Sequence, residues 1–421
     1  MNDGKGKRSN FILSEFGKKG KWAHHIMKHF ALNNSLRAGL FSLTLLLAGC
    51  LQPKRATVIY VGQDGTEVRR AELPLDNTLT LSFVSDLNDA ARYLAGMPGG
   101  INSQLGAVRQ TDRWKLHQAN VNELWRQFSS YRQPRIDSFA RRECGVLRNQ
   151  NTIFYPFSGP DILFASAFFP GATNYILCGL EGTDPLPQLA NLTQEQRDNG
   201  LDGIYTSITT ALNCSFFITK DMRVDLQRTE FKGTLPIMLV FLARLGLDID
   251  SVTPINLTAN GGTVEAAPGS TSQGFVIHAK SGFGHTKNIY YFRQNLADDG
   301  IASNPKFLNF VNSFGSFGTY IKSASYLMHT NEFSEIRAAI LGRSAGILQD
   351  DSGIPFRFFQ VPGWEVHLYG NYTGVLDIFQ SYYQPELTAA YQQGHSVESI
   401  DFGVGYKFNA GQSNLLMAIK R

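Results

Sequence analysis

Short apolar runs separated by Gly and Pro mark the middle of the chain, most clearly over residues 151–181. A mostly apolar run, Thr152–Tyr155, leads into a Pro-Phe-Ser-Gly-Pro-Asp turn. A second run, Ile162–Phe169, follows Asp161, which can cap a helix. A third, Tyr175–Leu180, ends at Glu181. Because short runs bounded by Gly and Pro are typical of buried strands, the pattern predicts strand, turn, helix and strand, the unit of a parallel sheet.

Other patterns place further elements on both sides of this unit. Residues 57–61 and 66–71 flank an Asp-Gly turn and predict a β-hairpin, whereas residues 84–95 and 114–144 have helical spacing. Beyond residue 181 we expect strands at 251–257, 274–279 and 287–293, the last two joined as a hairpin by the Ser281–His285 loop. Helices are expected at 233–247, 307–314 and 333–341. Residues 402–408 and 414–419 predict a closing antiparallel hairpin.

Together these elements predict an α/β protein. Its expected parts are a Rossmann-like core sheet flanked by helices, a mainly helical N-terminal region and a C-terminal antiparallel hairpin. The predicted divisions are a leader at 1–49, a tether at 50–56, the hairpin and helical region at 57–150, and the α/β core at 151–421.

Composition and charge narrow the function. With 43% hydrophobic and 18% charged residues, the 421-residue chain is globular and long enough for a substantial core. The net charge of +4 is concentrated in the leader: residues 1–49 hold eight of 39 basic and two of 35 acidic residues. The remaining 31 basic and 33 acidic residues form a slightly acidic body, which excludes nucleic acid as the expected partner.

The leader has the three parts of an export signal. Arg37 precedes an apolar core from Ala38 to Ala48, which is about half the ~20 residues of a membrane-spanning helix. The alternative is a soluble protein with a buried N-terminal helix. Leu47-Ala48-Gly49-Cys50 resembles the lipobox of bacterial lipoproteins.

That resemblance implies cleavage before Cys50 and fatty acylation, including palmitate, of this residue. Several acyl chains on one residue provide stable anchoring, so the predicted partner is a membrane. Leu51 rather than Asp after the cysteine implies sorting to the outer membrane of a diderm envelope. Because Met27-Lys28 would begin a signal of ordinary length, we expect residues 1–26 to be an over-extended start or a cleaved extra segment.

After Cys50 is lipidated, three cysteines remain. Cys178 is expected to be a buried apolar residue, and a Cys144–Cys214 bridge is possible in an oxidising compartment. The Cys and His spacings do not fit a zinc site, so no metal is predicted.

The turn after residue 155 is the first candidate ligand site. In a doubly wound sheet, ligands bind where a strand's carboxyl end opens into a helix, so Ser158, Gly159 and Asp161 could meet a ligand. Glu181, at the end of the next strand, could accept ribose hydroxyls. This arrangement, with the closing hairpin, resembles class I methyltransferases, although one Gly replaces their Gly-rich run and Pro160 removes an N–H. Because S-adenosylmethionine is cytoplasmic, we expect a fold-level relation and no cofactor.

A second candidate site gathers Lys322, His329, Asp350 and Asp351. The imidazole could act as a base, and the carboxylates could orient it or hold a cation. The alternative is structural, because Asp-Asp-Ser-Gly is also good turn chemistry. An aromatic series from Phe356 to Tyr383 could line a cleft or fill the core.

Two functional hypotheses follow. The first is a lipid-anchored binding or structural module of the cell envelope. The second is an envelope hydrolase using His329 with Asp350 or Asp351, or a degenerate methyltransferase-like nucleotide-binding fold.

Overall fold

The computed structural model describes residues 55–61, 67–74, 86–217, 226–393 and 397–421. The chain divides into two compact units, residues 1–79 and 80–421. Cys50, the leader before it and most of the predicted tether lie outside the described residues, so the lipid anchor stays a prediction.

The first unit contains a two-stranded antiparallel sheet. Strand β1 (Arg55–Val61) pairs with β2 (Glu67–Pro74), with Thr57 opposite Glu72. The two strands confirm the expected hairpin pairing, whereas the predicted Asp-Gly turn lies outside the described residues.

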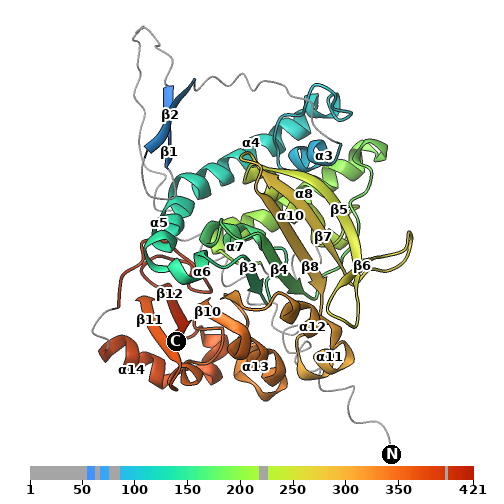
Figure 1. Cartoon of the computed structure of the whole chain (residues 1–421). Helices are drawn as coiled ribbons and strands as arrows, with labels where there is room; N and C mark the ends of the chain where they lie inside the picture. The colour runs from blue at the N-terminus through green and yellow to red at the C-terminus, as the bar shows by residue number, and fades with distance from the viewer. Residues whose placement is uncertain (1–54, 62–66, 75–85, 218–225, 394–396) are drawn as a thin grey trace, which may run out of the picture. The chain divides into compact units, whose positions relative to one another are not determined.

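The second unit is built on a ten-stranded mixed sheet, which confirms the α/β class (Figure 1). The strand order is β11-β12-β10-β9-β3-β4-β8-β7-β5-β6. The five neighbours from β10 to β8 run parallel, and the strands on both sides pair antiparallel. The strands are β3 (Thr152–Tyr155), β4 (Asn174–Gly179), β5 (Leu247–Leu257), β6 (Thr263–Glu265), β7 (Gly274–Ser281), β8 (Thr286–Arg293), β9 (Phe317–Ile321), β10 (Ser344–Gln349), β11 (Trp364–Gly370) and β12 (Asn414–Lys420).

The order of the parallel strands reverses between β3 and β9. From β3 the chain adds β4 and then β8 on one side, and it later returns to add β9 and β10 on the other side. The carboxyl ends of β3 and β9 are therefore neighbours, although more than 160 residues separate them along the chain. A crevice outside such a reversal is where doubly wound sheets bind their ligands.

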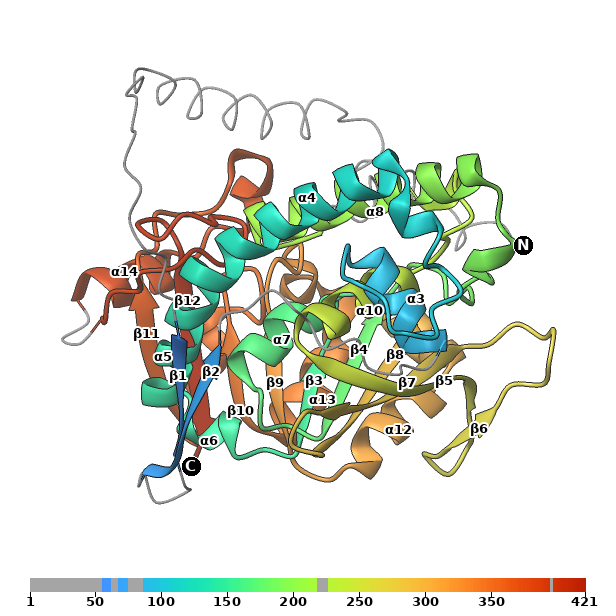
Figure 2. The ribbon, with the colours of Figure 1, turned by 90° about the horizontal axis from the view of Figure 1, so that it is seen from above.

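Helices cover both faces of this sheet (Figures 1 and 2). Along β3, Ile153 and Tyr155 point into one apolar core and Phe154 into the other, as the alternation of a strand requires. The first core is covered by α3 (Asp86–Leu94), α4 (Asp112–Gln127), a π-helix η2 (Phe128–Arg132), α5 (Gln133–Glu143), α6 (Gly145–Arg148), α7 (Ile162–Phe168), α8 (Gln194–Cys214) and α10 (Leu235–Arg244). The second is covered by α11 (Asp298–Ser303), α12 (Lys306–Ser313), α13 (Ser334–Arg343) and α14 (Pro385–Gln393).

Short 3-10 helices complete the unit. They are η1 (Val108–Gln110), η3 (Leu189–Asn191), η4 (Leu327–His329), η5 (Asn331–Phe333), η6 (Phe356–Phe359) and η7 (Asp377–Tyr382). Among the described helices, none is long and apolar enough to cross a membrane.

Local sequence signals explain where several helices begin and end. The Asp161 side chain caps α7 by accepting the Phe164 backbone N–H at 3.2 Å. Thr193 and Gln196 form a reciprocal capping box at the start of α8. After α10 the chain turns at Gly246, whose φ of +73° only glycine adopts without strain.

The predicted strand pairing of the closing hairpin is wrong. β12 forms as expected, but it pairs antiparallel with β11 and β10, not with residues 402–408. Residues 402–408 form no strand, because Gly405 turns the chain with a φ of +75°. An alternating pattern around glycines therefore marked a loop.

The three remaining cysteines and several members of the aromatic series are buried. Cys144, Cys178 and Cys214 are buried free thiols, so the Cys144–Cys214 bridge considered from the sequence is not formed. Burial raises the pKa of the Cys144 and Cys178 thiols to about 12, which makes them unreactive near neutral pH. In the aromatic series, Phe356, Phe359, Tyr372 and Phe379 are buried in the core.

Candidate functional site

The residues predicted to carry function follow four strands that end at the same edge of the sheet. Ser158, Gly159 and Asp161 follow β3, Glu181 follows β4, Lys322 follows β9, and Asp350 with Asp351 follows β10. All four strands run parallel, so their carboxyl ends meet at one edge. The topology thus brings residues from both predicted sites to the reversal between β3 and β9.

A buried ion pair spans this reversal. The Lys322 Nζ lies 2.6 Å from Oδ2 of Asp161, and each side chain is only 2% exposed. The Tyr155 hydroxyl donates to the same carboxylate at 2.9 Å, and Lys322 also donates to the Ser215 carbonyl and lies 4.6 Å from the Phe164 ring centre. Burial raises the pKa of Asp161, and the Lys322 ammonium opposes that rise. Each charge is therefore held by the other and by polar partners rather than by solvent.

In the turn after β3, the backbone N–H groups that could bind a phosphate are already hydrogen-bonded within the protein. The backbone N–H groups of Ser158 and Gly159 both donate to the Cys178 carbonyl, at 3.0 and 3.3 Å. The Ser158 hydroxyl also lies against the Cys178 backbone, accepting its N–H at 3.1 Å. These bonds attach the turn to the end of β4.

Glu181 points back into the protein and fills space above two glycines. It is 3% exposed, and the Tyr291 hydroxyl donates to its Oε2 at 3.0 Å. A Cβ added to Gly179 would lie 2.1 Å from that oxygen, and one added to Gly159 would lie 3.3 Å from Oε1. The carboxylate is therefore turned into the protein, against Gly159 and Gly179, and is not presented to a ligand at the sheet edge.

Asp350 and Asp351 hold the turn that follows β9. Asp350 accepts the Ser323 N–H at 2.8 Å and the Ser352 N–H at 3.0 Å. Asp351 accepts bonds from the Tyr326 hydroxyl and from Asn414 Nδ2. Burial and the neighbouring Asp351 carboxylate raise the pKa of Asp350 to about 7.

The turn itself has an unusual backbone. Ser323, Ser325 and Tyr326 have positive φ values of 51°, 52° and 55°, which L-residues rarely adopt. The N–H groups of Ala324 and Ser325 donate to the Ser352 hydroxyl and the Tyr406 hydroxyl. Side chains from the segment after β10 and from residue 406 thus stabilise the turn, which gives the acidic pair a structural role.

His329 lies beside this acidic pair but is oriented by other groups. Its ring packs against Tyr326 and Tyr382, with centroid distances of 5.2 and 5.7 Å, and approaches the backbone of Asp351 and Gly353. Burial, together with the Arg357 charge, lowers the pKa of His329 to about 4. The imidazole is therefore neutral at neutral pH, and the carboxylates are bonded to Tyr326, Asn414, Ser323 and Ser352.

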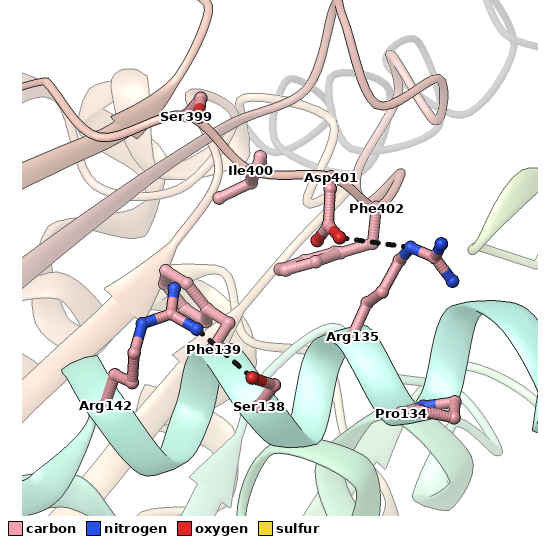
Figure 3. Close-up of a pocket in the computed structure, with 9 residues that line it drawn as sticks. All are labelled: Pro134, Arg135, Ser138, Phe139, Arg142, Ser399, Ile400, Asp401 and Phe402. Carbon is pink, nitrogen blue, oxygen red and sulfur yellow. Dashed lines mark hydrogen bonds and ion pairs between the residues drawn. The ribbon is translucent and has the colours of Figure 1, made fainter.

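An open groove lies elsewhere, along α5 (Figure 3). Its volume is about 540 Å³, and residues 399–402 form the wall opposite the helix. Phe139, Ile400 and Phe402 are its buried apolar residues. Arg135, Ser138 and Arg142 lie on the helix side, and Arg135 Nε reaches Asp401 at 3.1 Å across the groove.

The two arginines at this groove were missed in the sequence. Arg135 and Arg142 are seven residues apart, so they lie on one face of α5, about 10 Å apart along the axis. The Arg142 Nη1 donates to the Ser138 hydroxyl at 3.2 Å, its Nε lies 3.4 Å from Oε1 of Glu143, and its side chain is 57% exposed. Two arginines at a spacing of seven in a helical pattern were the signal that could have identified them.

No protein-family model matches the chain, and no curated protein or solved structure matches it either. Among the described residues, no group of three or more His, Cys, Asp or Glu side chains is placed to hold a metal ion. At the carboxyl edge Lys322 and the four carboxylates are paired or hydrogen-bonded, whereas the buried Tyr320 hydroxyl, Ser323 hydroxyl and His329 Nε2 have no hydrogen-bond partner among the described residues. At the α5 groove the guanidinium groups of Arg135 and Arg142 lie near Asp401 and Glu143, and guanidinium groups can bind anions.

Proposed function

We propose that this chain is a lipid-anchored protein of the cell envelope whose folded body is a binding module. The anchor would be Cys50, and Leu51 after it favours the outer membrane. The body would be a Rossmann-like scaffold, related at the level of fold to class I methyltransferases, that needs no cofactor. The observation that carries the proposed binding is the open groove along α5, and the buried Asp161–Lys322 pair across the β3/β9 reversal argues against a nucleotide at the sheet edge.

The strand arrangement supports the scaffold. The chain builds outward from β3 in both directions, as doubly wound nucleotide-binding sheets do, and β12 runs antiparallel between β10 and β11 at the end of the chain. A terminal antiparallel pair is also a feature of the methyltransferase family that the β3–β4 segment resembles.

The hydrogen bonds at the ends of β3 and β4 argue against a nucleotide as the ligand. In that family a ligand would meet the turn after β3 and the acidic residue after β4. Here the N–H groups of Ser158 and Gly159 bind the Cys178 carbonyl, and Glu181 binds Tyr291. A nucleotide would have to break these contacts and expose a buried ion pair, which costs several kcal/mol by order of magnitude.

The hydrolase alternative has less geometric support. A general base needs a basic nitrogen beside the proton it takes, and a pKa near the working pH. His329 has a pKa lowered to about 4, and Asp350 and Asp351 stabilise the turn after β9 instead of orienting its ring.

The α5 groove is the surface on which we expect the module to bind its ligand. Arg135 and Arg142 carry planar guanidinium groups that suit phosphate or carboxylate oxygens when a ligand replaces Asp401 and Glu143 as their partners, and Phe139 with Phe402 supplies an apolar floor. A ligand with two anionic groups about 10 Å apart would match the spacing of two helical turns. Tripolyphosphate is a simple probe of this chemistry.

Thermal unfolding with tripolyphosphate tests the binding function. At a hundredfold its Kd the probe should stabilise the protein by about 2.7 kcal/mol. Arg142→Gln should weaken binding at least tenfold, because it removes one anion contact, a change of about 1.4 kcal/mol. Arg141→Gln is the matched control, since Arg141 is 63% exposed on the same helix but pairs with Asp137 outside the groove. Equal effects of the two variants, or no stabilisation of the wild type, would refute the groove as the anion-binding site.

A further inference from the structure

Two arginines are buried in the described part of the chain, and one of them has no carboxylate partner there. Arg109 is 5% exposed, and its Nη2 lies 3.0 Å from Oδ1 of Asp89. Arg337, on α13, is 9% exposed and forms no ion pair with a described carboxylate. Because arginine is rarely buried unless it is paired, the charge of Arg337 lacks the counter-ion that its burial requires.

The guanidinium group of Arg337 is held on both sides of His329. Its Nη1 donates to the carbonyls of Met328 and Thr330, at 2.6 and 3.0 Å, and these residues flank the histidine. The His329 Nε2 is buried and has no hydrogen-bond partner among the described residues. Since native proteins give most buried polar atoms a partner, this nitrogen is a second polar group of the cluster whose partner is not another described residue.

Arg357 adds a second guanidinium group without an ion pair. The Cζ atoms of Arg337 and Arg357 lie 4.8 and 5.1 Å from the ring centre of Phe358, so the two charges cannot be further apart than the sum of these distances. Arg357 is exposed, and it also pairs with no described carboxylate. Burial and the repulsion of Arg357 lower the pKa of Arg337. Two like charges thus lie close together without an anion to separate them.

The acidic side chains of the neighbourhood are bonded elsewhere or exposed. Asp298 attracts Arg337, but its two oxygens accept hydrogen bonds at the start of α13, from a serine hydroxyl and a backbone N–H. Glu332 and Glu335 are exposed and pair with neither arginine. The acidic pair after β10 is bonded within the turn after β9. No described carboxylate therefore neutralises the cluster by direct contact.

The cluster is built by segments that follow two neighbouring parallel strands. His329 lies in the segment after β9, Arg357 and Phe358 lie in η6 after β10, and Arg337 is on α13, which connects the two strands. Ligands of α/β proteins bind outside the carboxyl ends of the parallel strands. The cluster uses a different part of that edge from the turn after β3, whose N–H groups are bonded to β4.

We propose that this cluster binds a phosphate group, with Arg337 and Arg357 as its positive contacts and His329 as a further donor. A phosphate monoester carries about two negative charges at neutral pH and has three acceptor oxygens, so it can balance both arginines. Planar guanidinium groups suit such oxygens, and a neutral imidazole can donate from Nε2. The inference is independent of the α5 groove and of the lipid anchor.

Calorimetric titration of the purified protein with inorganic phosphate tests this site. Arg357→Gln should weaken binding by roughly tenfold or more, because it removes one of the two charges. Arg357 is exposed, so we expect the variant to fold. Arg343→Gln is the matched control, since Arg343 is also exposed and lies at the other end of α13 without an ion pair. No binding to the wild type, or equal losses in the two variants, overturns the proposal.

The His329 ring distinguishes this site from the α5 groove. Burial and the Arg357 charge lower the pKa of His329 to about 4, and phosphate bound at Arg357 should raise that pKa by neutralising the charge. NMR titration of the imidazole with and without phosphate, at constant ionic strength, measures the shift. The shift should persist in Arg142→Gln and be absent in Arg357→Gln. A pKa that phosphate leaves unchanged in the wild type, or a shift lost in Arg142→Gln, contradicts the site.

A second titration identifies the source of the phosphate group. Glycerol 3-phosphate replaces inorganic phosphate in the same NMR measurement. An equal rise of the His329 pKa supports a phosphate monoester or a lipid headgroup as the ligand, and a rise with inorganic phosphate alone supports the free ion. A rise with neither probe overturns the proposal.

Discussion

Lys322 and Asp161 show that residues with catalytically useful side chains can have a structural role. Both were predicted as site residues from the sequence, in two different sites, and the fold joins them in one ion pair that is 2% exposed. Removing one member of a buried pair leaves an uncompensated charge, whereas replacing both members often costs little. This asymmetry allows the role of the pair to be measured.

Lys322→Met should therefore destabilise the protein strongly, by about 3–5 kcal/mol, because Asp161 would remain buried without its cation. Asp161→Asn in the same chain should recover much of that loss, since Asn keeps the cap on α7 without the charge. Urea unfolding of the two single variants and the double variant measures the coupling. A Lys322→Met variant as stable as the double variant would contradict the paired role.

The Asp350 carboxyl predicts a pH dependence of stability. Its folded pKa, about 7, is above its unfolded value, so between pH 4 and 7 the folded state holds a proton that the unfolded state has lost. The contribution of this group to the free energy of unfolding therefore falls as pH rises through that window and is constant above it.

Asp350→Asn should remove this slope. The variant also places an amide against the Ser323 N–H, so we expect it to be less stable than the wild type at every pH. The measurement is the difference in unfolding free energy between the two proteins from pH 4 to pH 8. A difference independent of pH would show that the carboxyl is ionised throughout.

At the scale of elements, local sequence patterns predicted helices and strands but not all the pairings between the strands. The β3–α7–β4 segment was predictable because Asp161, Pro170 and Gly171 mark its boundaries. The partner of β12 was not, because β11 ends more than 40 residues earlier and no local pattern encodes such a pairing. The same limit applies to the site: the sequence named Asp161 and Lys322, but only the order of the strands brings them together.

Gly405 tests how the segment before β12 is held. Its φ is +75°, and a Cβ there would lie 2.3 Å from Oδ2 of Asp350. Gly246, with a φ of +73° and open space around its Cβ position, is a matched control for backbone strain alone. Gly246→Ala should cost about 1–2 kcal/mol. Gly405→Ala should cost more because its Cβ displaces the carboxylate, and equal losses in thermal unfolding would contradict this contact.

At the scale of the molecule, the two edges of the parallel strands differ in composition. The carboxyl edge bears the Asp161–Lys322 pair and the hydrogen-bonded carboxylates of Asp350 and Asp351, and the amino edge bears the exposed loop between β7 and β8. A fold-level relation to a nucleotide-binding family does not imply its activity, because function depends on the site. The lipid anchor proposed at Cys50 agrees with this view, since it would place the body away from cytoplasmic cofactors.

Equilibrium binding of S-adenosylmethionine to the purified protein tests the central claim most directly. Because Lys322, Asp161 and Glu181 are buried and paired at the strand reversal, we predict no saturable binding at millimolar ligand and no change in the thermal unfolding midpoint. Stoichiometric binding that Lys322→Met or Glu181→Gln alters would contradict the account, because it would show that the crevice opens to a nucleotide.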